Sequence, residues 1–112
     1  RTLAELAGPS VSFEDVHRDI ALEAPFGVPL VDAMVDAVSG EDPDATVLPY
    51  MLSGGTDNKS LARLGIAGYG FAPLRLPAGL DFAGMFHGVD ERVPIDALRF
   101  GVRALTRFVR SC

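Results

Sequence analysis

The sequence predicts an α/β fold, in which helices pack on a sheet. Two stretches, residues 28–39 and residues 94–110, carry apolar side chains at helical spacing. Residues 16–23, 45–48 and 66–71 have the short alternating or apolar patterns that are typical of strands. The 112 residues are 48% apolar and 22% charged, which is the composition of a globular protein rather than of a disordered chain.

The first 24 residues are predicted to be the end of one domain. Residues 1–8 have the pattern of a helix end, which Gly8-Pro9 stops. Residues 16–23 follow as an edge strand with one half-buried face. Its apolar parity is Val16, Ile20 and Leu22, and its polar parity is His17, Asp19 and Glu23. Pro25-Phe26-Gly27 marks a boundary, so residues 25–112 form the second predicted domain.

Residues 28–39 give the clearest helix of the chain. Pro29 suits its first turn, and Gly40 suits its end. Its predicted buried face is Val31, Met34, Val35 and Val38.

The middle of the second domain alternates short elements with loops. Proline cannot donate to a ladder, so Pro49 is expected to end the strand before it. In order, we expect an acidic turn (residues 41–44), a short strand (45–48), a short helix (58–64) ended by Gly65, a second strand (66–71) and an irregular connection (72–86).

The chain is predicted to be helical from Pro94 to about Arg110. Two stripes of side chains run along this helix. The stripe predicted to be buried is Ile95, Leu98, Val102, Leu105 and Val109. The other stripe is Arg99, Arg103 and Arg107, and it is expected to be a solvated face rather than a binding patch.

Charge and composition exclude some classes of function. A net charge of -5 argues against a nucleic-acid partner, because phosphate binding needs clustered basic residues. No apolar run reaches the roughly 18 residues of a membrane span, so no membrane partner is expected. The single cysteine, Cys112, excludes an intrachain disulfide and favours a cytoplasmic location. The sequence starts at Arg1 without Met or a signal-peptide layout, and we expect it to belong to a longer gene product.

The glycine-rich stretch Gly54-Gly55-Thr56-Asp57 is the first candidate site, because it opens the short helix that begins at Asn58. Unpaired backbone N–H groups at a helix N-terminus can hold an anion, and Lys59 would add a full positive charge. Thr56 or Asp57 could cap the helix. The alternative is a capped turn in which the glycines supply positive φ. The spacing is not that of a Walker loop.

His87 is the candidate metal ligand, because neutral imidazole is a common zinc donor. Asp90 and Glu91 could accept hydrogen bonds that orient the ring. The alternative is a surface histidine, with the two carboxylates favouring the dipole of the following helix. A catalytic zinc site takes about three protein ligands, and this chain has one credible histidine, so it cannot complete such a site alone.

Three motifs in order resemble the M20 family of metallopeptidases and amidohydrolases. They are Gly54-Gly55-Thr56-Asp57 followed by Asn58-Lys59, the G-F-x-P turn at Gly70-Phe71-Ala72-Pro73, and H-G-x-D-E-R from His87 to Arg92. This family includes aminoacylase-1, carboxypeptidase S, acetylornithine deacetylase and succinyl-diaminopimelate desuccinylase. The last motif is more similar to the aminoacylase and carboxypeptidase S branch than to the desuccinylases.

This resemblance implies a zinc-peptidase-like α/β catalytic domain that is interrupted by an α+β lid domain. Residues 1–24 would be the end of the lid, through which the enzyme could form a homodimer. Residues 25–112 would be the C-terminal part of the catalytic domain. His87 would be one ligand of a centre of two zinc ions, and residues 54–57 with Lys59 would line the substrate pocket. Lys59 stands where many members have Arg, which puts a bidentate grip on a carboxylate in doubt.

The resemblance implies a hydrolase of the metallopeptidase class that cleaves an amide bond in an N-acyl amino acid or small peptide. The general base and the other metal ligands would come from the rest of the catalytic domain, so no catalytic residue is expected in this chain and it would be inactive alone. The alternative is a non-catalytic α/β binding or dimerisation module whose glycine loop holds an anion.

Overall fold

A computed structural model describes residues 2–112, in which all of the regular structure is helical. The segments are α1 (Leu3–Ala7), α2 (Pro29–Ser39), α3 (Asn58–Ala62), the 3-10 turn η1 (Ala83–Met85) and α4 (Ile95–Ser111). The four predicted helices are therefore confirmed, the two shorter ones over fewer residues than expected. Arg1, which begins the predicted first helix and first domain, lies outside the described residues.

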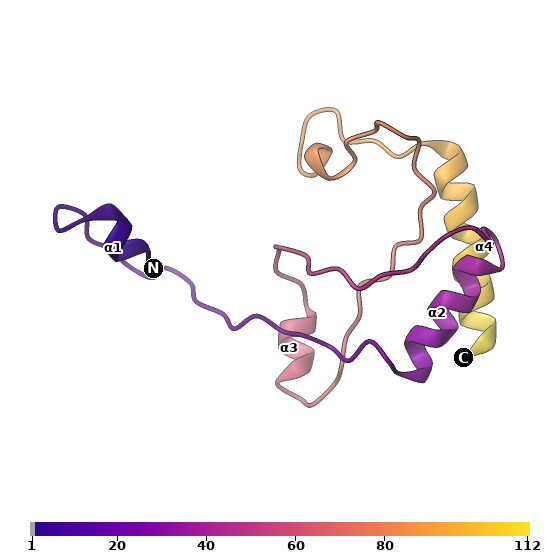
Figure 1. Ribbon diagram of the computed structural model, residues 1–112, viewed down its shortest axis with the longest axis horizontal. Helices are drawn as coiled ribbons and strands as arrows, with labels where there is room; N and C mark the ends of the chain where they lie inside the picture. The colour runs from indigo at the N-terminus through magenta and orange to yellow at the C-terminus, as the bar shows by residue number, and fades with distance from the viewer. Residues whose placement is uncertain (1) are drawn as a thin grey trace.

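The α/β prediction is wrong, because the structure has no strand anywhere in residues 2–112. The three segments with strand patterns run as irregular chain, and the part between α1 and α2 is an extended stretch that passes beside α3 (Figure 1). Val16 and Ile20, expected on a half-buried face, are 96% and 84% exposed. Strands are stabilised by ladder hydrogen bonds and cross-strand contacts, and these segments do not pair with one another.

Helices α2 and α4 form the only packed pair among the described elements, and they lie side by side in Figure 1. The buried residues of α2 are Val31, Met34 and Ala37, and those of α4 are Ala97, Phe100, Gly101 and Ala104. The start and end of α2 are as predicted, with Pro29 in the first turn and the N–H of Gly40 bonded to the carbonyl of Asp36 at 2.9 Å.

The predicted buried face of α4 is wrong, because the aliphatic stripe points to solvent. Its exposed fractions are 67% for Ile95, 48% for Leu98, 64% for Val102, 40% for Leu105 and 69% for Val109. The face with small residues packs instead, since alanine and glycine let a neighbour approach closely. A Cβ atom on Gly101 would lie 2.9 Å from the carbonyl oxygen of Pro73 and 3.2 Å from a methyl carbon of Leu74. Helix α4 thus has two apolar faces, and only one is covered within residues 2–112.

A carboxylate clamp joins the end of α2 to α4. Arg103 and Arg107 each donate an Nε–H hydrogen bond of 2.6 Å to Glu41. The side chain of Glu41 is 12% exposed, so it is held from two sides in a half-buried position. These hydrogen bonds, first that from Arg107 and then that from Arg103, hold the pKa of Glu41 below its ordinary value of 4.5. The arginine stripe is therefore partly a structural face rather than a purely solvated one.

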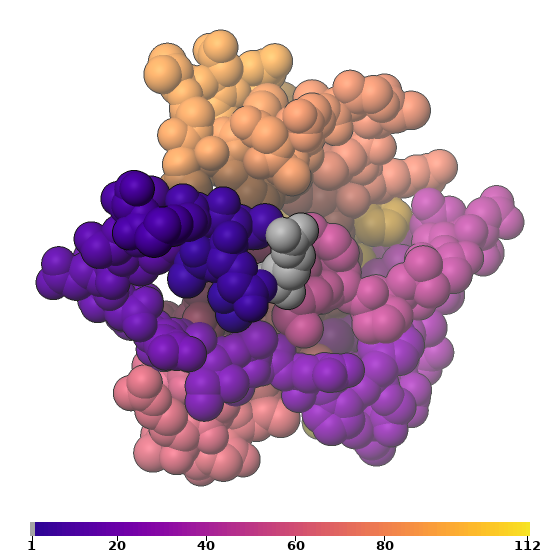
Figure 2. Space-filling view, turned by 60° about the vertical axis from the view of Figure 1, so that its left-hand side comes forward, coloured from indigo at the N-terminus to yellow at the C-terminus, as the bar shows by residue number. Residues whose placement is uncertain are grey.

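The molecule is open rather than densely packed. Its radius of gyration is 18.3 Å, whereas a compact domain of about 100 residues has about 13 Å. Figure 2 shows this as lobes, with α3 and the loop that contains η1 separated from each other. Helix α1 buries none of its residues. Most of the described chain is therefore positioned by a few specific contacts rather than by a common core.

We expect Phe100→Ala to destabilise the α2–α4 pair, because Phe100 is the largest side chain of its core and is 6% exposed. Truncating a buried Phe lowers the free energy of unfolding by about 3 kcal/mol or more. Urea unfolding followed by circular dichroism measures the change. The control is Val102→Ala on the exposed face of the same helix, which should cost about 0.5 kcal/mol or less. Equal losses for the two variants would contradict the described core.

The Glu41 clamp should make the stability of the helix pair depend on pH. Because folding lowers the pKa of Glu41, its contribution is complete above its ordinary value of 4.5 and is lost as the pH falls through the lower folded pKa. Glu41→Gln should remove this step from the pH dependence of unfolding. Asp44→Asn, an exposed position in the same turn, serves as the control and should keep it. If the free energy of unfolding of Glu41→Gln falls by the same amount over this pH range, other carboxylates cause the pH dependence.

Candidate functional site

The glycine loop is exposed and is not held in a left-handed conformation. Neither Gly54 nor Gly55 has a positive φ, and nothing lies within 4 Å of a Cβ atom built on Gly55. The hydroxyl oxygen of Thr56 accepts a hydrogen bond of 3.3 Å from the backbone N–H of Asn58. Asp57 precedes α3 without a side-chain capping bond. The loop is therefore a capped turn, but not one that needs glycine for positive φ.

Helix α3 has five residues, so it offers little dipole to an anion. Its first backbone N–H groups are already used within the chain. The backbone N–H of Lys59, for example, donates to the carbonyl of Thr56 at 3.1 Å. Helix α3 ends at Ala62, two residues earlier than predicted, and Gly65, at φ +76°, lies in the turn that follows it. Next to it, the N–H of Ile66 bonds to the carbonyl of Leu61 at 3.1 Å, as in a Schellman end. The charge that could hold an anion here is therefore that of Lys59.

Asn58 fixes the start of α3 against the segment that follows the helix. Any side chain at Gly68 would collide with the side-chain amide of Asn58. The absence of a side chain at position 68 lets residues 66–71 approach the start of α3 closely. The hydroxyl of Tyr69 then donates a 2.9 Å hydrogen bond to the carbonyl of Pro25.

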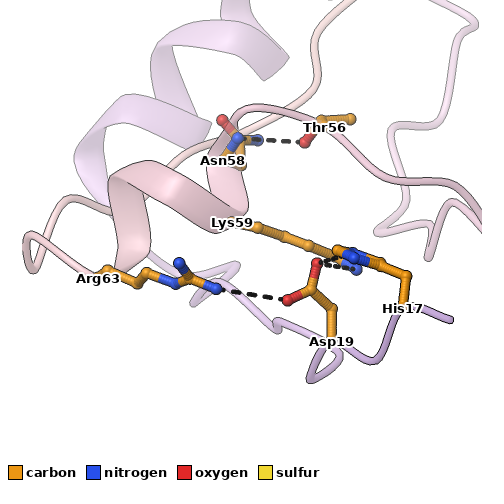
Figure 3. A network of polar contacts seen from close by, with 6 residues as sticks. All are labelled: His17, Asp19, Thr56, Asn58, Lys59 and Arg63. Carbon is orange, nitrogen blue, oxygen red and sulfur yellow. Dashed lines mark hydrogen bonds and ion pairs between the residues drawn. The ribbon is translucent and has the colours of Figure 1, made fainter. Parts of the chain in front are cut away.

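Lys59 lies in a cluster of charges that the sequence did not reveal (Figure 3). The carboxylate of Asp19 lies 3.6 Å from Lys59 Nζ and 3.6 Å from a guanidinium nitrogen of Arg63. Nε2 of His17 lies 2.9 Å from the same carboxylate. The hydrogen bond from His17, and then the charge of Lys59, hold the pKa of Asp19 below its ordinary value. His17 itself is 81% exposed, as predicted.

His87 lies in a tight turn directly after η1. Its φ is 60°, and it is the only residue other than glycine with a positive φ in the described chain. Its backbone N–H donates a 3.1 Å hydrogen bond to Oε2 of Glu91, and the N–H of Gly88 donates to the carbonyl of Met85 at 2.9 Å. Non-glycine residues in this region are strained and are found where the surroundings enforce them, often at functional sites.

Of the two carboxylates next to His87, only that of Glu91 has a hydrogen bond to the backbone of the turn, and Asp90 takes part through its backbone carbonyl. Glu91 holds the N–H of His87, while the carbonyl of Asp90 accepts a 3.0 Å hydrogen bond from Arg92. Within residues 2–112, no side chain hydrogen-bonds the ring of His87, which is exposed. The ring is thus presented outward on a turn of fixed shape.

The predicted site residues fall into two separate groups. Lys59 lines a hollow of about 200 Å³ together with Asp19, Ile20, Leu22, Ala62 and Arg63. His87 lines neither this hollow nor the larger one of about 300 Å³ between the end of α2 and α4. In the part of the chain that the structure describes, no three His, Cys, Asp or Glu side chains are grouped to hold a metal ion. The chain offers His87 as a single donor to a metal.

Comparison with known proteins gives no relative: no family model, no curated protein and no solved structure matches the chain. Across residues 2–112, no helix has both the length and the apolar character needed to cross a membrane.

We expect Glu91→Ala to loosen the His87 turn, because it removes the acceptor of the His87 backbone N–H. Loss of one such hydrogen bond should speed exchange of the His87 amide proton by about a factor of five. Amide exchange by NMR measures this. Asp90→Ala is the matched control, since its backbone carbonyl still accepts from Arg92. The same acceleration in both variants would show that Glu91 does not close the turn.

Proposed function

We propose that this chain is the C-terminal part of an M20-type zinc amidohydrolase, in which His87 is a metal ligand. The observation that carries the proposal is the turn at His87. Its φ of 60° and the hydrogen bond from its backbone N–H to Glu91 fix the backbone from which an exposed imidazole extends, within the H-G-x-D-E-R motif. Because this backbone is already fixed, metal binding would have to order only the side chain of His87.

His87 fits zinc as one donor of a larger set, since a neutral imidazole is a preferred ligand. Zinc, when bound, supplies Lewis-acid activation for hydrolysis of an amide bond. The work of this chain is to supply the His87 ring, with Glu91 fixing the backbone that carries it. The general base and the other ligands come from the rest of the parent enzyme in this proposal.

The substrate in this proposal is an N-acyl amino acid or small peptide with a free carboxylate. Lys59 is the residue of this chain that would attract that carboxylate, because its ammonium group lines a hollow. Lysine binds as a point charge, so recognition would rest on attraction more than on geometry. Gly54, Gly55, Thr56 and Asp57 do not line this hollow. In this proposal their exposed loop would contact another part of the substrate.

The rest of the parent enzyme is the first partner in this proposal. The exposed stripe on α4 supports it, because Ile95, Val102 and Val109 are each more than 60% exposed and lie on one face. A contiguous exposed apolar face marks an interaction surface. In this proposal the face packs against the N-terminal part of the catalytic domain, which precedes the lid in the parent enzyme.

The segment before residue 25 would belong to the lid of the parent, through which two copies could associate. Leu3 and Leu6 support this, since they are 71% and 64% exposed on a helix with no buried residue. A cytoplasmic location is part of the same proposal.

The test is metal content and hydrolysis of N-acetyl amino acids by the full-length parent and its His87→Ala variant. Because one ligand is removed, we expect loss of about one zinc equivalent per chain and a fall in kcat by a factor of about 100 or more. Val89→Ala, in the same loop at a fully exposed position, should keep both metal and activity.

Two results would overturn the proposal. One is a His87→Ala variant with unchanged zinc and unchanged activity. The other is a Val89→Ala variant that loses as much zinc as His87→Ala, because this would trace the loss to a damaged loop rather than to the imidazole.

A further inference from the structure

The hollow beside α3 holds two cations, Lys59 and Arg63, that its one internal carboxylate does not fully satisfy. Figure 3 shows Asp19 between Lys59 and His17 on one side and Arg63 on the other. The separations of 3.6 Å to Lys59 and to Arg63 are those of ion pairs rather than of hydrogen bonds. Most of the N–H donors of these two groups are therefore free of Asp19, and two positive charges face one negative charge.

The other wall of the same hollow is aliphatic. Ile20, Leu22 and Ala62 line it together with the charged groups, and its volume is about 200 Å³. The side chain of Lys59 is 33% exposed and that of Asp19 is 21% exposed, so these charges are partly withdrawn from water. Charges in such a position attract a counter-ion more strongly than fully exposed ones.

The segment that carries Asp19 is held to the rest of the molecule by little else. Among the described residues, positions 12–24 make no backbone–backbone hydrogen bond. Their ion pairs to the remainder of the chain are those of Asp19 with Lys59 and Arg63. Releasing Asp19 would therefore break almost no backbone structure.

We propose that this hollow is a binding site for a small aliphatic carboxylate, and that Asp19 is its internal competitor. The ligand carboxylate takes the place of Asp19 on Lys59 and Arg63, and its aliphatic group lies against Ile20, Leu22 and Ala62. Binding displaces only the side chain of Asp19 and leaves its segment at the hollow, because Ile20 and Leu22 of the same segment form the aliphatic wall. The ligand and the Asp19 carboxylate therefore exclude each other. The inference rests on the proposed function only for the source of the carboxylate, which would be the substrate.

The experiment is a titration of the 112-residue chain with butanoate, followed by NMR shifts of the amides in α3. Asp19→Asn keeps the size of the side chain and removes its charge, so it should bind butanoate about five times more tightly. Lys59→Gln should bind it at least about five times more weakly, by the same argument. Arg18→Gln is the control, because Arg18 is 84% exposed, pairs with Asp15 and does not line the hollow.

The outcomes are separable from those of the zinc experiment. Unchanged or weaker butanoate binding by Asp19→Asn overturns this inference. So does a loss in Arg18→Gln as large as that in Lys59→Gln, because binding would then follow net charge. 1-Butanol has the same aliphatic chain without the charge, so Asp19→Asn should not raise its affinity for the hollow. A higher affinity for 1-butanol in Asp19→Asn would also overturn the inference. None of these results depends on metal binding at His87, so either proposal can fail while the other stands.

Discussion

The contact between α2 and α4 is the interaction on which the rest of this structure depends. It joins elements more than 60 residues apart, through Glu41 with Arg103 and Arg107 and through a small apolar core. Small residues on α4 make the contact possible, and Gly101 lets the chain at Pro73 approach the helix closely. Because the loop with His87 lies between Pro73 and the start of α4, both of its ends are fixed to the same helix. The position of His87, the candidate metal ligand, therefore depends on the packed helices α2 and α4.

The molecule outside this pair is organised by charge and by backbone turns. Asp19 ties the N-terminal segment to α3, Asn58 lies against Gly68, and Tyr69 reaches the carbonyl of Pro25. Single contacts of this kind place a segment without burying much surface. An arrangement held in this way leaves apolar side chains exposed, as on α4, and it suits a chain that works together with a larger partner.

The sequence predicted the helices well, because helix formation depends on local spacing and on end signals. Pro29 and Gly40 bound α2 as expected, and Gly65 lies with positive φ in the turn after α3. Strands need a partner that spacing cannot supply, so the pattern at residues 16–23 did not produce a sheet. The buried face of α4 was misjudged for a related reason. Periodicity located an apolar face, but α4 has two, and the small residues rather than the aliphatic ones met α2.

The candidate site also has features that the local sequence predicts and features that depend on tertiary contacts. His87 was predicted from residue type and motif, whereas its left-handed backbone and the role of Glu91 depend on how the turn closes. The cluster around Asp19 was not predicted, because Asp19 and Lys59 are 40 positions apart and no spacing rule links them. Its residues were assigned to an exposed strand face and to a glycine loop. Only the folded chain shows that they meet.

The most direct test of the central claim is a crystal structure of the zinc-loaded full-length parent, with anomalous scattering recorded at the zinc edge. The account predicts a ring nitrogen of His87 about 2.0–2.1 Å from a zinc ion, with the backbone of the turn still bonded to Glu91. A fully loaded zinc centre with the His87 ring more than about 4 Å from every metal ion would contradict it, because imidazole ligands bind zinc at about half that distance.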